Sequence, residues 1–462
     1  MARLRFADTK LMTMHAQLKR LGLFDARVPR YTSYPTAPHF SGDVGPAEAR
    51  NWIAAIPERD TVSIYVHIPF CRRLCWFCAC RTQGTATAAP VAAYLGSLKA
   101  ELELVRAELP QGVEIEHLHW GGGTPTLLKP EMIGELAKAI FDVAPLTRDA
   151  QFSVEIDPNE IDDARLDALA AAGMNRASIG IQYFDAESQQ TIGRPQSYEV
   201  TKAAVEGLRA RGIDSLNVDI LYGLPHQTKQ KISQSVQLLL SLGPDRVALF
   251  GYAHVPWMAK RQQLIPTEAL PVPEERLELF NVARDLFRWD GYAEIGIDHF
   301  ARPGDGLEVA WREGTMRRNF QGYTEDKSET LIGLGASAIS RYRQGYAQND
   351  PSTSGYQKAV RGGGFATRRG HAFTGDDRLR AAVIEALLCD FRCDLTAAAE
   401  RAGQSPASAI ALADGLEVAF PKMLRVRDGT VEIFDHARPL ARIIARHFDA
   451  YEVSAAGHSH AV

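Results

Sequence analysis

Short apolar and β-branched runs alternate with longer stretches of helical periodicity along the first two thirds of the chain. The runs lie near residues 62–68, 115–120, 152–157, 177–182, 216–221, 246–251 and 292–297. The helical patterns lie at residues 90–109, 130–143, 162–172, 198–211, 229–242 and 274–289. Strand–helix alternation at this spacing predicts a parallel sheet with right-handed crossovers. Six or seven such units predict an α/β fold built on a partial parallel (β/α) barrel, with an open doubly wound sheet as the alternative.

The pattern changes at both ends of this alternating region. Prolines flank residues 29–35, which favours an extended or turn-like N-terminal extension. Beyond about residue 351, Ala-, Leu- and Arg-rich stretches of helical periodicity accompany a short β-like segment at 430–433. We therefore expect a small, mainly helical C-terminal domain. The predicted divisions are an N-terminal extension over 1–55, the barrel domain over 56–350, the C-terminal domain over 351–453 and a disordered tail over 454–462.

Polar side chains occupy alternate positions in several of the predicted strands. They are Tyr65, His67, Glu155, Gln182, Asn217 and Asp219. Because successive residues of a strand point to opposite faces, these side chains face away from the apolar set. Helices covering the apolar face would leave the polar groups inside the barrel, near the carboxyl ends of the strands. One such group alone is usually a satisfied structural residue, but their repetition favours a chamber for a zwitterionic nucleoside.

A cluster of cysteines follows the first predicted strand. Cys71, Cys75 and Cys78 have the spacing Cys-x3-Cys-x2-Cys, and closely spaced thiolates on a loop can bind one iron–sulfur cluster. Three ligands on a four-iron cluster leave one iron open to a reactant. The structural alternative is a zinc knuckle, but it needs a second ligand pair at a distance, and none is spaced correctly.

Cys80 lies two residues after this motif and has three possible roles. It could be a fourth ligand, a buried small hydrophobic residue or a functional thiol. The reach from Cys78 is tight for a shared cluster, which favours a role other than ligation.

Successive glycines follow the second predicted strand, in the segment 121–126 with sequence GGGTPT. Glycines at the carboxyl end of a strand allow the backbone to approach a ligand closely. Such a turn can simply connect two elements, but its position one unit beyond the cysteine loop favours a binding loop.

The composition, with 45% hydrophobic and 23% charged residues, is that of a soluble globular protein. The formal net charge of -4 provides no basic field for nucleic acid or an anionic membrane surface. No apolar run is long enough to span a bilayer, and the N-terminus lacks a compact apolar block. We therefore expect no secretory signal and a cytoplasmic location.

With these motifs in place, the cysteine spacing and the GGGTPT loop resemble the radical SAM superfamily. Further segments narrow the resemblance to the oxygen-independent coproporphyrinogen III oxidase family, from about residue 25 to beyond residue 440. They are 29–36 (PRYTSYPT), 65–71 (YVHIPFC), 78–80 (CAC), 252–254 (YAH), 296–300 (GIDHF) and 319–324 (NFQGYT).

The resemblance implies that Cys71, Cys75 and Cys78 ligate a 4Fe-4S cluster and that S-adenosylmethionine (SAM) chelates its open iron. It also implies a second SAM molecule nearby. The first molecule should contact Tyr65, Gly122, Glu155 and Ile339. The second should contact Phe77, Gly123, Thr124, Gln182, Arg194, Asp219 and Ala253. The candidate catalytic residues are Tyr65, His67 and Cys80.

The implied activity is the oxygen-independent oxidative decarboxylation of two propionate side chains of coproporphyrinogen III, which gives protoporphyrinogen IX. A 5′-deoxyadenosyl radical derived from SAM abstracts a hydrogen from the propionate β-carbon, and loss of CO2 and one electron leaves a vinyl group. The implied partners are this substrate and an electron-donating reductase or flavodoxin. We expect a monomer that binds neither nucleic acid nor a membrane.

Three other functions are compatible with parts of this pattern. They are a haem-binding relative in the same family, a radical methyltransferase, and a non-enzymatic iron–sulfur protein. Cys80 and the 30–36 motif argue against the first, and the last leaves the polar interior unexplained. A tetracarboxylate substrate needs cationic partners, for which Arg30, Arg302, Arg317 and Arg318 are the candidates near family motifs.

Overall fold

The computed structural model describes residues 15–452 and residue 461, and its largest unit is a 12-stranded mixed sheet. Neighbouring strands run parallel in the order β13-β1-β4-β5-β6-β7-β8. Their bounds are β1 Thr61–Ile68, β4 Glu114–Gly122, β5 Leu146–Ile156, β6 Arg176–Gln182, β7 Ser215–Tyr222, β8 Arg246–Gly251 and β13 Thr330–Leu334. No pairing within the described residues joins β16 and β9, the two ends of the sheet. The predicted partial parallel barrel is thereby confirmed.

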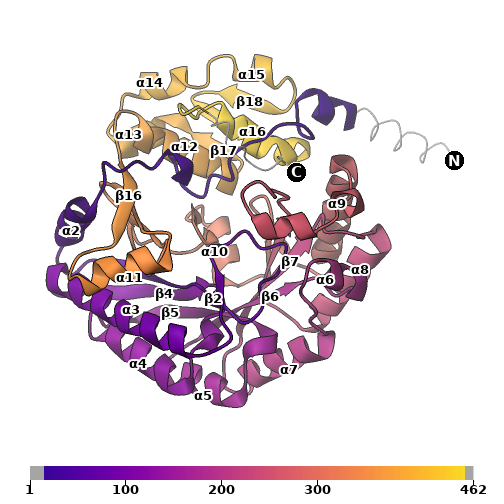
Figure 1. Cartoon of the computed structure of the whole chain (residues 1–462). Coiled ribbons are helices and arrows are strands. Elements are labelled where there is room, and N and C mark those ends of the chain that lie inside the picture. The colour runs from indigo at the N-terminus through magenta and orange to yellow at the C-terminus, as the bar shows by residue number, and fades with distance from the viewer. Residues whose placement is uncertain (1–14, 453–460, 462) are drawn as a thin grey trace.

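Helices surround the strands on the outer face (Figure 1). They are α3 Ala89–Glu108, α4 Pro130–Phe141, α5 Asp163–Ala171, α6 Ala186–Thr191, α7 Tyr198–Arg209, α8 Lys229–Ser241 and α9 Pro273–Trp289. In α4, Pro130 occupies the first turn, and the buried residues Ile133, Leu136, Ala137 and Ile140 recur at helical spacing. These residues join the apolar face of the strands in one large core, so the polar face of each strand is left for the barrel interior.

The predicted run at 292–297 differs from the other strands. It forms only the short β9 (Ala293–Ile295), which pairs antiparallel with β10 (His299–Ala301), and β10 pairs antiparallel with β8. β9 therefore runs in the same direction as β8, as the alternating pattern predicts, but it does not pair with β8, because the chain turns back at Gly296, whose φ is 56°, and β10 lies between them. The remaining parallel strand is β13, beside β1, which the alternating pattern did not include.

Antiparallel strands extend the sheet beyond β13. They are β14 Ile339–Tyr342, β15 Gly345–Asn349 and β16 Thr367–Ala372, with α11 Thr353–Arg361 between the last two. α11 packs on α3, and Tyr356 and Val360 of α11 belong to the barrel core. A division at residue 351 would separate these elements from that core. We therefore propose that the C-terminal domain begins near residue 373.

A second core lies in the C-terminal domain. Its elements are α12 Asp377–Cys389, β17 Arg392–Asp394, α13 Leu395–Ala402, α14 Pro406–Ala411, α15 Leu416–Ala419, β18 Leu424–Arg427, β19 Thr430–Ile433 and α16 Ala441–Arg446. Leu23, Phe24, Tyr31 and Tyr34 of the N-terminal extension are buried in this same core. In Figure 1 the C-terminal domain lies above the barrel, and the N-terminal segment runs along its lower side.

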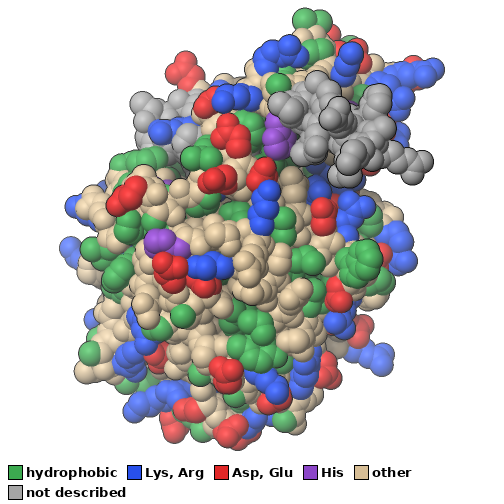
Figure 2. All heavy atoms as spheres, turned by 90° about the vertical axis from the view of Figure 1, so that its right-hand side faces the viewer, with side chains coloured by type: hydrophobic (Ala, Val, Ile, Leu, Met, Phe, Trp, Pro, Cys, Tyr) green, Lys and Arg blue, Asp and Glu red, His purple; other side chains and the backbone are tan. Residues whose placement is uncertain are grey.

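Shorter elements complete the fold. They are α2 Pro46–Ala54, β2 Phe70–Cys71, β3 Gln83–Gly84, α10 Gly306–Arg312, β11 Arg317–Asn319 and β12 Gly322–Thr324. The described helices include none that is long and apolar enough to cross a membrane. The face shown in Figure 2 mixes acidic and basic side chains. The tail predicted over 454–462 lies outside the described residues except for residue 461.

Candidate active site

The three predicted cluster ligands lie on the loop that follows β1. Cys71 ends β2, and β3 closes the loop by pairing alongside it, with the amide of Thr85 donating to the carbonyl of Cys71 at 3.0 Å. Cys75 is buried, whereas Cys71 and Cys78 are partly exposed. The amide of Trp76 donates to the carbonyl of Ile192 at 2.9 Å, which holds the middle of the loop against the barrel.

The sulfur atoms of these cysteines do not converge on one point. Within the described part of the chain, a single group of candidate metal ligands has its donor atoms within 4.8 Å of one another, and it is Glu116, His117 and Asp326 near the amino ends of the strands. A zinc ion needs donors arranged around one centre at about 2.3 Å, whereas the thiolates of an iron–sulfur cluster bind different irons. The three sulfurs therefore do not form a preassembled zinc site.

Two neighbours influence the thiols of the loop. Arg194 Nη1 lies 3.5 Å from Cys75 Sγ. The amide of Cys80 donates to Cys78 Sγ at 3.4 Å, and hydrogen bonding with Cys80 lowers the pKa of the Cys78 thiol to about 6. Cys78 is thus available as a thiolate at neutral pH, which is the form that binds iron.

The glycine loop runs directly beside the cysteine loop. The amides of Gly123 and Thr124 donate to the carbonyls of Ile68 and Phe70 at 2.8 and 2.7 Å. A Cβ atom at Gly123 would lie 2.5 Å from the Phe70 carbonyl oxygen, so only glycine allows this approach. Gly122 has a φ of 111°, and its Cβ would meet the His67 ring at 2.6 Å. The glycines are therefore required by the packing of the two loops.

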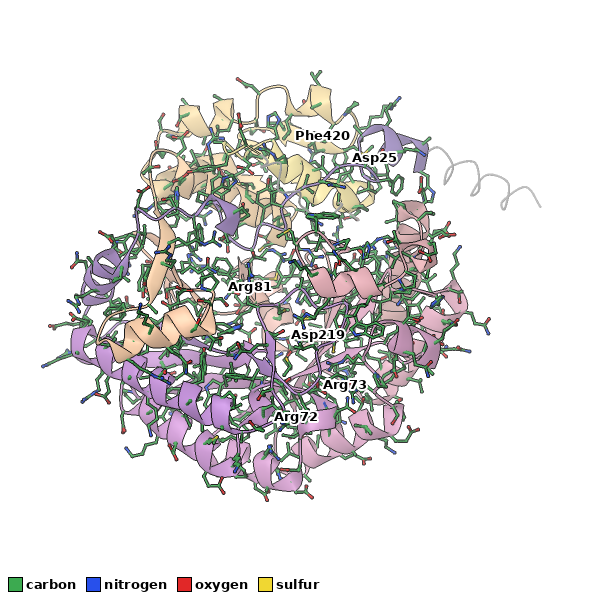
Figure 3. All side chains as sticks on the ribbon, in the orientation of Figure 1. Asp25, Arg72, Arg73, Arg81, Asp219 and Phe420 are labelled. Atoms are coloured by element: carbon green, nitrogen blue, oxygen red, sulfur yellow. The ribbon has the colours of Figure 1, made fainter. Side chains whose placement is uncertain are left out.

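A cavity of about 690 Å³ runs along the inner face of the strands, from Arg176 and Arg246 at their amino ends to Gly122 and Cys80 of these loops. Of the predicted site residues, it is lined by Tyr65, His67, Cys80, Gly122, Glu155, Asp219 and Ile339. In Figure 3, Asp219 and Arg81 lie in the middle of the molecule, between the barrel helices and the C-terminal domain that contains Phe420. Strand alternation predicted interior positions for six polar side chains, and Tyr65, His67, Glu155, Asn217 and Asp219 line the cavity as expected, whereas Gln182 is not among its lining residues.

Glu155 connects the glycine loop to the aromatic side of the cavity. Its Oε2 accepts from the amide of Gly122 at 3.0 Å, and its Oε1 lies 3.5 Å from His119 Nε2. His119 in turn hydrogen-bonds Ser153 and stacks on Tyr65, with ring centroids 5.8 Å apart. His119 lines the cavity but was not among the predicted residues, although it occupies an alternate position of β4 and the same strand argument applies to it.

His67 has a defined hydrogen-bonding role. Its Nε2 lies 3.1 Å from the carbonyl oxygen of Arg81, so this nitrogen carries the proton, and Nδ1 accepts from the Tyr65 hydroxyl at 3.0 Å. Burial lowers the pKa of His67, which favours the neutral ring. Tyr65 is thus held as a donor to a neutral imidazole.

Asp219 lies inside the cavity, and the groups around it only partly compensate its negative charge. Burial, followed by the like charge of Glu155, raises the pKa of Asp219 to about 7. The amide of Asn217 donates to its Oδ1 at 3.2 Å, and Arg194 provides a smaller opposing effect. A ligand that donates hydrogen bonds or carries a positive charge would complete this site.

Arg194 lies between the cysteine loop and β6. It donates from Nη2 to the carbonyl of Gly180 at 2.9 Å, and its Nη1 lies 3.3 Å from Asp157 Oδ2. Its Nε has no hydrogen-bond partner within the described residues, although it is buried. Gln182 is close by, since a Cβ on Gly180 would lie 3.1 Å from Gln182 Nε2. Arg194 therefore connects the cysteine loop to the end of β6.

Gln262 is a site residue that sequence reasoning missed. It is fully buried, and its Nε2 donates to the carbonyls of Phe77 at 2.7 Å and Ala253 at 3.0 Å. Its Oε1 accepts from the amide of Val255 at 2.6 Å. Phe77 and Ala253 are both predicted SAM contacts, so Gln262 fixes the distance between them. It lies in a short 3-10 helix without strand periodicity, and no signal in the sequence marks it.

The four candidate arginines separate into two pairs. None of the four lines the large cavity. Arg302 donates to the Tyr292 hydroxyl at 3.1 Å, and Arg317 donates to the carbonyl of Lys327 at 3.2 Å. Arg30 donates to the carbonyl of Gly251 at 2.9 Å, next to Phe250 of the cavity wall. Arg318 lies over the ring of Tyr323, another residue of that wall, at 4.6 Å.

Comparison with known proteins connects this geometry to characterised families. The family model of the radical SAM superfamily matches residues 65–239. The oxygen-independent coproporphyrinogen III oxidase of Paracoccus denitrificans (strain Pd 1222) is 58% identical over 451 residues, covering 98% of this chain and 100% of that protein. The protein of the same name from Escherichia coli (strain K12) is 43% identical over 366 residues, covering 79% of this chain and 80% of that protein.

A solved structure of a coproporphyrinogen III oxidase also matches the fold of this chain. The coproporphyrinogen III oxidase HemN from Escherichia coli, described as a radical SAM enzyme, has a TM-score of 0.87 and 37% identity to this chain. The match covers 92% of this chain and 100% of that chain, so it includes the barrel and the C-terminal domain.

Proposed function

The chain belongs to the oxygen-independent coproporphyrinogen III oxidase family of the radical SAM superfamily, and from this premise we propose how its residues perform the reaction. The reaction converts two propionate side chains of coproporphyrinogen III to vinyl groups and yields protoporphyrinogen IX. The observation that carries the assignment of the site is that the cysteine loop, Gly122, Glu155 and Asp219 all meet at one cavity.

Cys71, Cys75 and Cys78 hold the 4Fe-4S cluster, and their separated thiols fit its several irons. When bound, the cluster and SAM supply a 5′-deoxyadenosyl radical that removes a hydrogen from the propionate β-carbon. The chain's own residues bind, orient and shield the reactants. Gly122 and Glu155 place an amide and a carboxylate together beside the cysteine loop, and Tyr65 and Ile339 also line the cavity.

A second SAM molecule is the finer part of the proposal. Phe77, Gly123, Thr124, Gln182, Arg194, Asp219 and Ala253 would contact it. Two nearby groups support this assignment: the Asp219 carboxylate, whose charge is only partly compensated, and the Arg194 Nε, which is buried without a hydrogen-bond partner among the described residues. A zwitterion presents both an ammonium and a carboxylate to such a pair. The Glu155 carboxylate would likewise bind positively charged or hydrogen-bond donor groups of the first SAM molecule.

Tyr65, His67 and Cys80 are proposed to act on the substrate side of the cavity. Cys80 is exposed, lines the cavity and hydrogen-bonds Cys78, so we assign it as a thiol facing the substrate and not as a fourth ligand. His67 stays neutral and positions the Tyr65 hydroxyl. We further propose a cytoplasmic monomer that receives electrons from a reductase or flavodoxin and binds neither nucleic acid nor a membrane.

Anaerobic assay of the cluster-loaded chain with reductant, SAM and coproporphyrinogen III tests this function. We expect 5′-deoxyadenosine, CO2 and protoporphyrinogen IX. Absence of both 5′-deoxyadenosine and protoporphyrinogen IX would refute the proposal. A methylated porphyrinogen would identify a methyltransferase, and haem binding without turnover would identify a haem-binding relative.

Replacing Gln262 with leucine should weaken binding at the proposed second SAM site. The variant leaves the carbonyls of Phe77 and Ala253 and the amide of Val255 without their partner, so the two segments are no longer held together. We expect SAM affinity at one site to fall about tenfold, with cluster absorbance unchanged. Equilibrium dialysis with labelled SAM would count both sites.

The exposed neighbour Gln263 provides the matched control, since Gln263→Leu changes the same side chain outside this network. Two unaltered binding sites in Gln262→Leu would contradict the positioning role.

A further inference from the structure

Four arginines gather where the barrel meets the C-terminal domain. They come from the N-terminal extension (Arg30), α9 (Arg276), β11 (Arg318) and α16 (Arg442). Burial lowers the pKa of Arg30 and of Arg276, and Arg30 is also opposed by the charge of Arg318. Segments far apart in the sequence thus bring like charges together, which is unfavourable unless an anion compensates them.

Arg30, Arg276 and Arg318 donate hydrogen bonds to backbone carbonyl groups. Arg30 donates to the Gly251 carbonyl at 2.9 Å, Arg276 to the Tyr252 carbonyl at 2.7 Å, and Arg318 to the Arg30 carbonyl at 3.2 Å. Arg442 donates to the carbonyl of Val28 at 2.7 Å. The backbone carbonyls of segment 28–30 therefore accept hydrogen bonds from two arginines of the cluster, and the segment lies between them.

Carboxylates are scarce around three of these groups. Within the described residues, Arg30, Arg276 and Arg318 make no ion pair within 4.0 Å. The Nε of Arg276 and both Nε and Nη1 of Arg318 are buried without a hydrogen-bond partner among those residues. Asp298 is the one carboxylate that acts on both Arg30 and Arg318 among the described residues; it lies beyond ion-pair distance of them, and its Oδ1 is 2.7 Å from His299 Nδ1.

Arg30 and Arg318 lie beside the wall of the catalytic cavity, although neither is among the residues that line it. The side chain of Arg30 is exposed. Its partner Gly251 follows Phe250, and Arg318 covers Tyr323; both Phe250 and Tyr323 line the cavity. In Figure 1 the N-terminal segment carrying Arg30 runs along the lower side of the C-terminal domain, facing the barrel.

We propose that Arg30 and Arg318, supported by Arg276 and Arg442, bind the carboxylates of the propionate side chains that do not react. This inference rests on the proposed function, since it takes the tetracarboxylate porphyrinogen as the ligand. The planar fork of a guanidinium group matches a carboxylate with two hydrogen bonds. Two propionates survive both decarboxylations, so a site for them holds the ring while the other two are presented to the reacting centre.

Porphyrin binding to the cluster-loaded chain tests the inference without turnover. The probes are coproporphyrin III, the stable oxidised ring with four carboxylates, and its tetramethyl ester, in which they are masked. We expect the unaltered chain to bind the free acid at least about tenfold more tightly than the ester, with a difference that shrinks at high salt. Arg30→Gln and Arg318→Gln should each raise the Kd of the free acid about tenfold and leave that of the ester unchanged.

Arg302→Gln and Arg317→Gln are the matched controls, because their guanidinium groups bond elsewhere. Arg318→Lys should restore part of the affinity, since it keeps the charge but not the fork. Equal affinity of the unaltered chain for acid and ester would overturn the proposal even if a variant failed to fold. So would unchanged binding of the acid by both glutamine variants. Porphyrin binding that follows this pattern without any vinyl product would instead refute the proposed function alone.

Discussion

Replacing Cys75 with alanine is expected to abolish the visible absorbance of the iron–sulfur cluster and product formation together. Cys75 is 7% exposed and carries one of the three thiolates, so its loss leaves two ligands for a cluster that must also keep one iron open. We expect activity to fall by more than about 100-fold, beyond what loss of an outer-shell partner typically costs. Iron and sulfide analysis and anaerobic product assays measure both effects.

Two other cysteines serve as controls for this experiment. Cys393→Ala changes a buried cysteine in the C-terminal core and should retain both cluster and activity. Cys80→Ala should retain the cluster absorbance and lose product formation, because its thiol faces the cavity. A Cys75→Ala chain that keeps its cluster would contradict the ligand assignment. Loss of the cluster in Cys80→Ala would show that Cys80 is a ligand.

The parallel part of the fold was predictable because its signals are local. The runs at 62–68 and 246–251 correspond to β1 and β8, since each is a short run rich in apolar and β-branched residues that a helical pattern follows along the chain. β13 was missed because no helix of the alternating series precedes it, and its place beside β1 is set by pairing between segments far apart in the sequence. The role of α11 and β16 in the barrel core likewise depends on pairing between distant segments.

In the site, too, residues placed by the local strand pattern could be predicted, whereas residues placed by long-range contacts could not. Glu155 and Asp219 could be placed in the interior because strand alternation fixes the face on which a side chain lies. Gln262 and the arginine cluster could not be placed in this way. Their function depends on which carbonyl groups the tertiary fold brings near them, and a loop or helix residue carries no periodic signal for that.

Replacing Asp219 with asparagine should stabilise the cofactor-free chain at alkaline pH and weaken SAM binding. The folded-state pKa of about 7 exceeds the ordinary value of 3.8, so the folded chain retains a proton that the unfolded chain releases. The cost of burying the charge is absent below about pH 4, grows as the pH rises to about 7, and is then constant. At 1.36 kcal/mol per pKa unit, its upper limit is about 4 kcal/mol.

Asparagine cannot ionise, so Asp219→Asn should match the unaltered chain near pH 4 and exceed it in free energy of unfolding at pH 8, as measured by urea denaturation. Its SAM affinity should fall about tenfold or more, because an amide cannot replace a carboxylate that faces ammonium or hydroxyl groups. Asp428→Asn, at an exposed site, should change stability by less than about 0.5 kcal/mol at either pH. The same stability difference at both pH values would show that the Asp219 charge is already compensated in the folded chain. If Asp219→Asn is more stable at pH 8 but binds SAM more weakly, the Asp219 carboxylate destabilises the folded chain and is needed for binding its ligand.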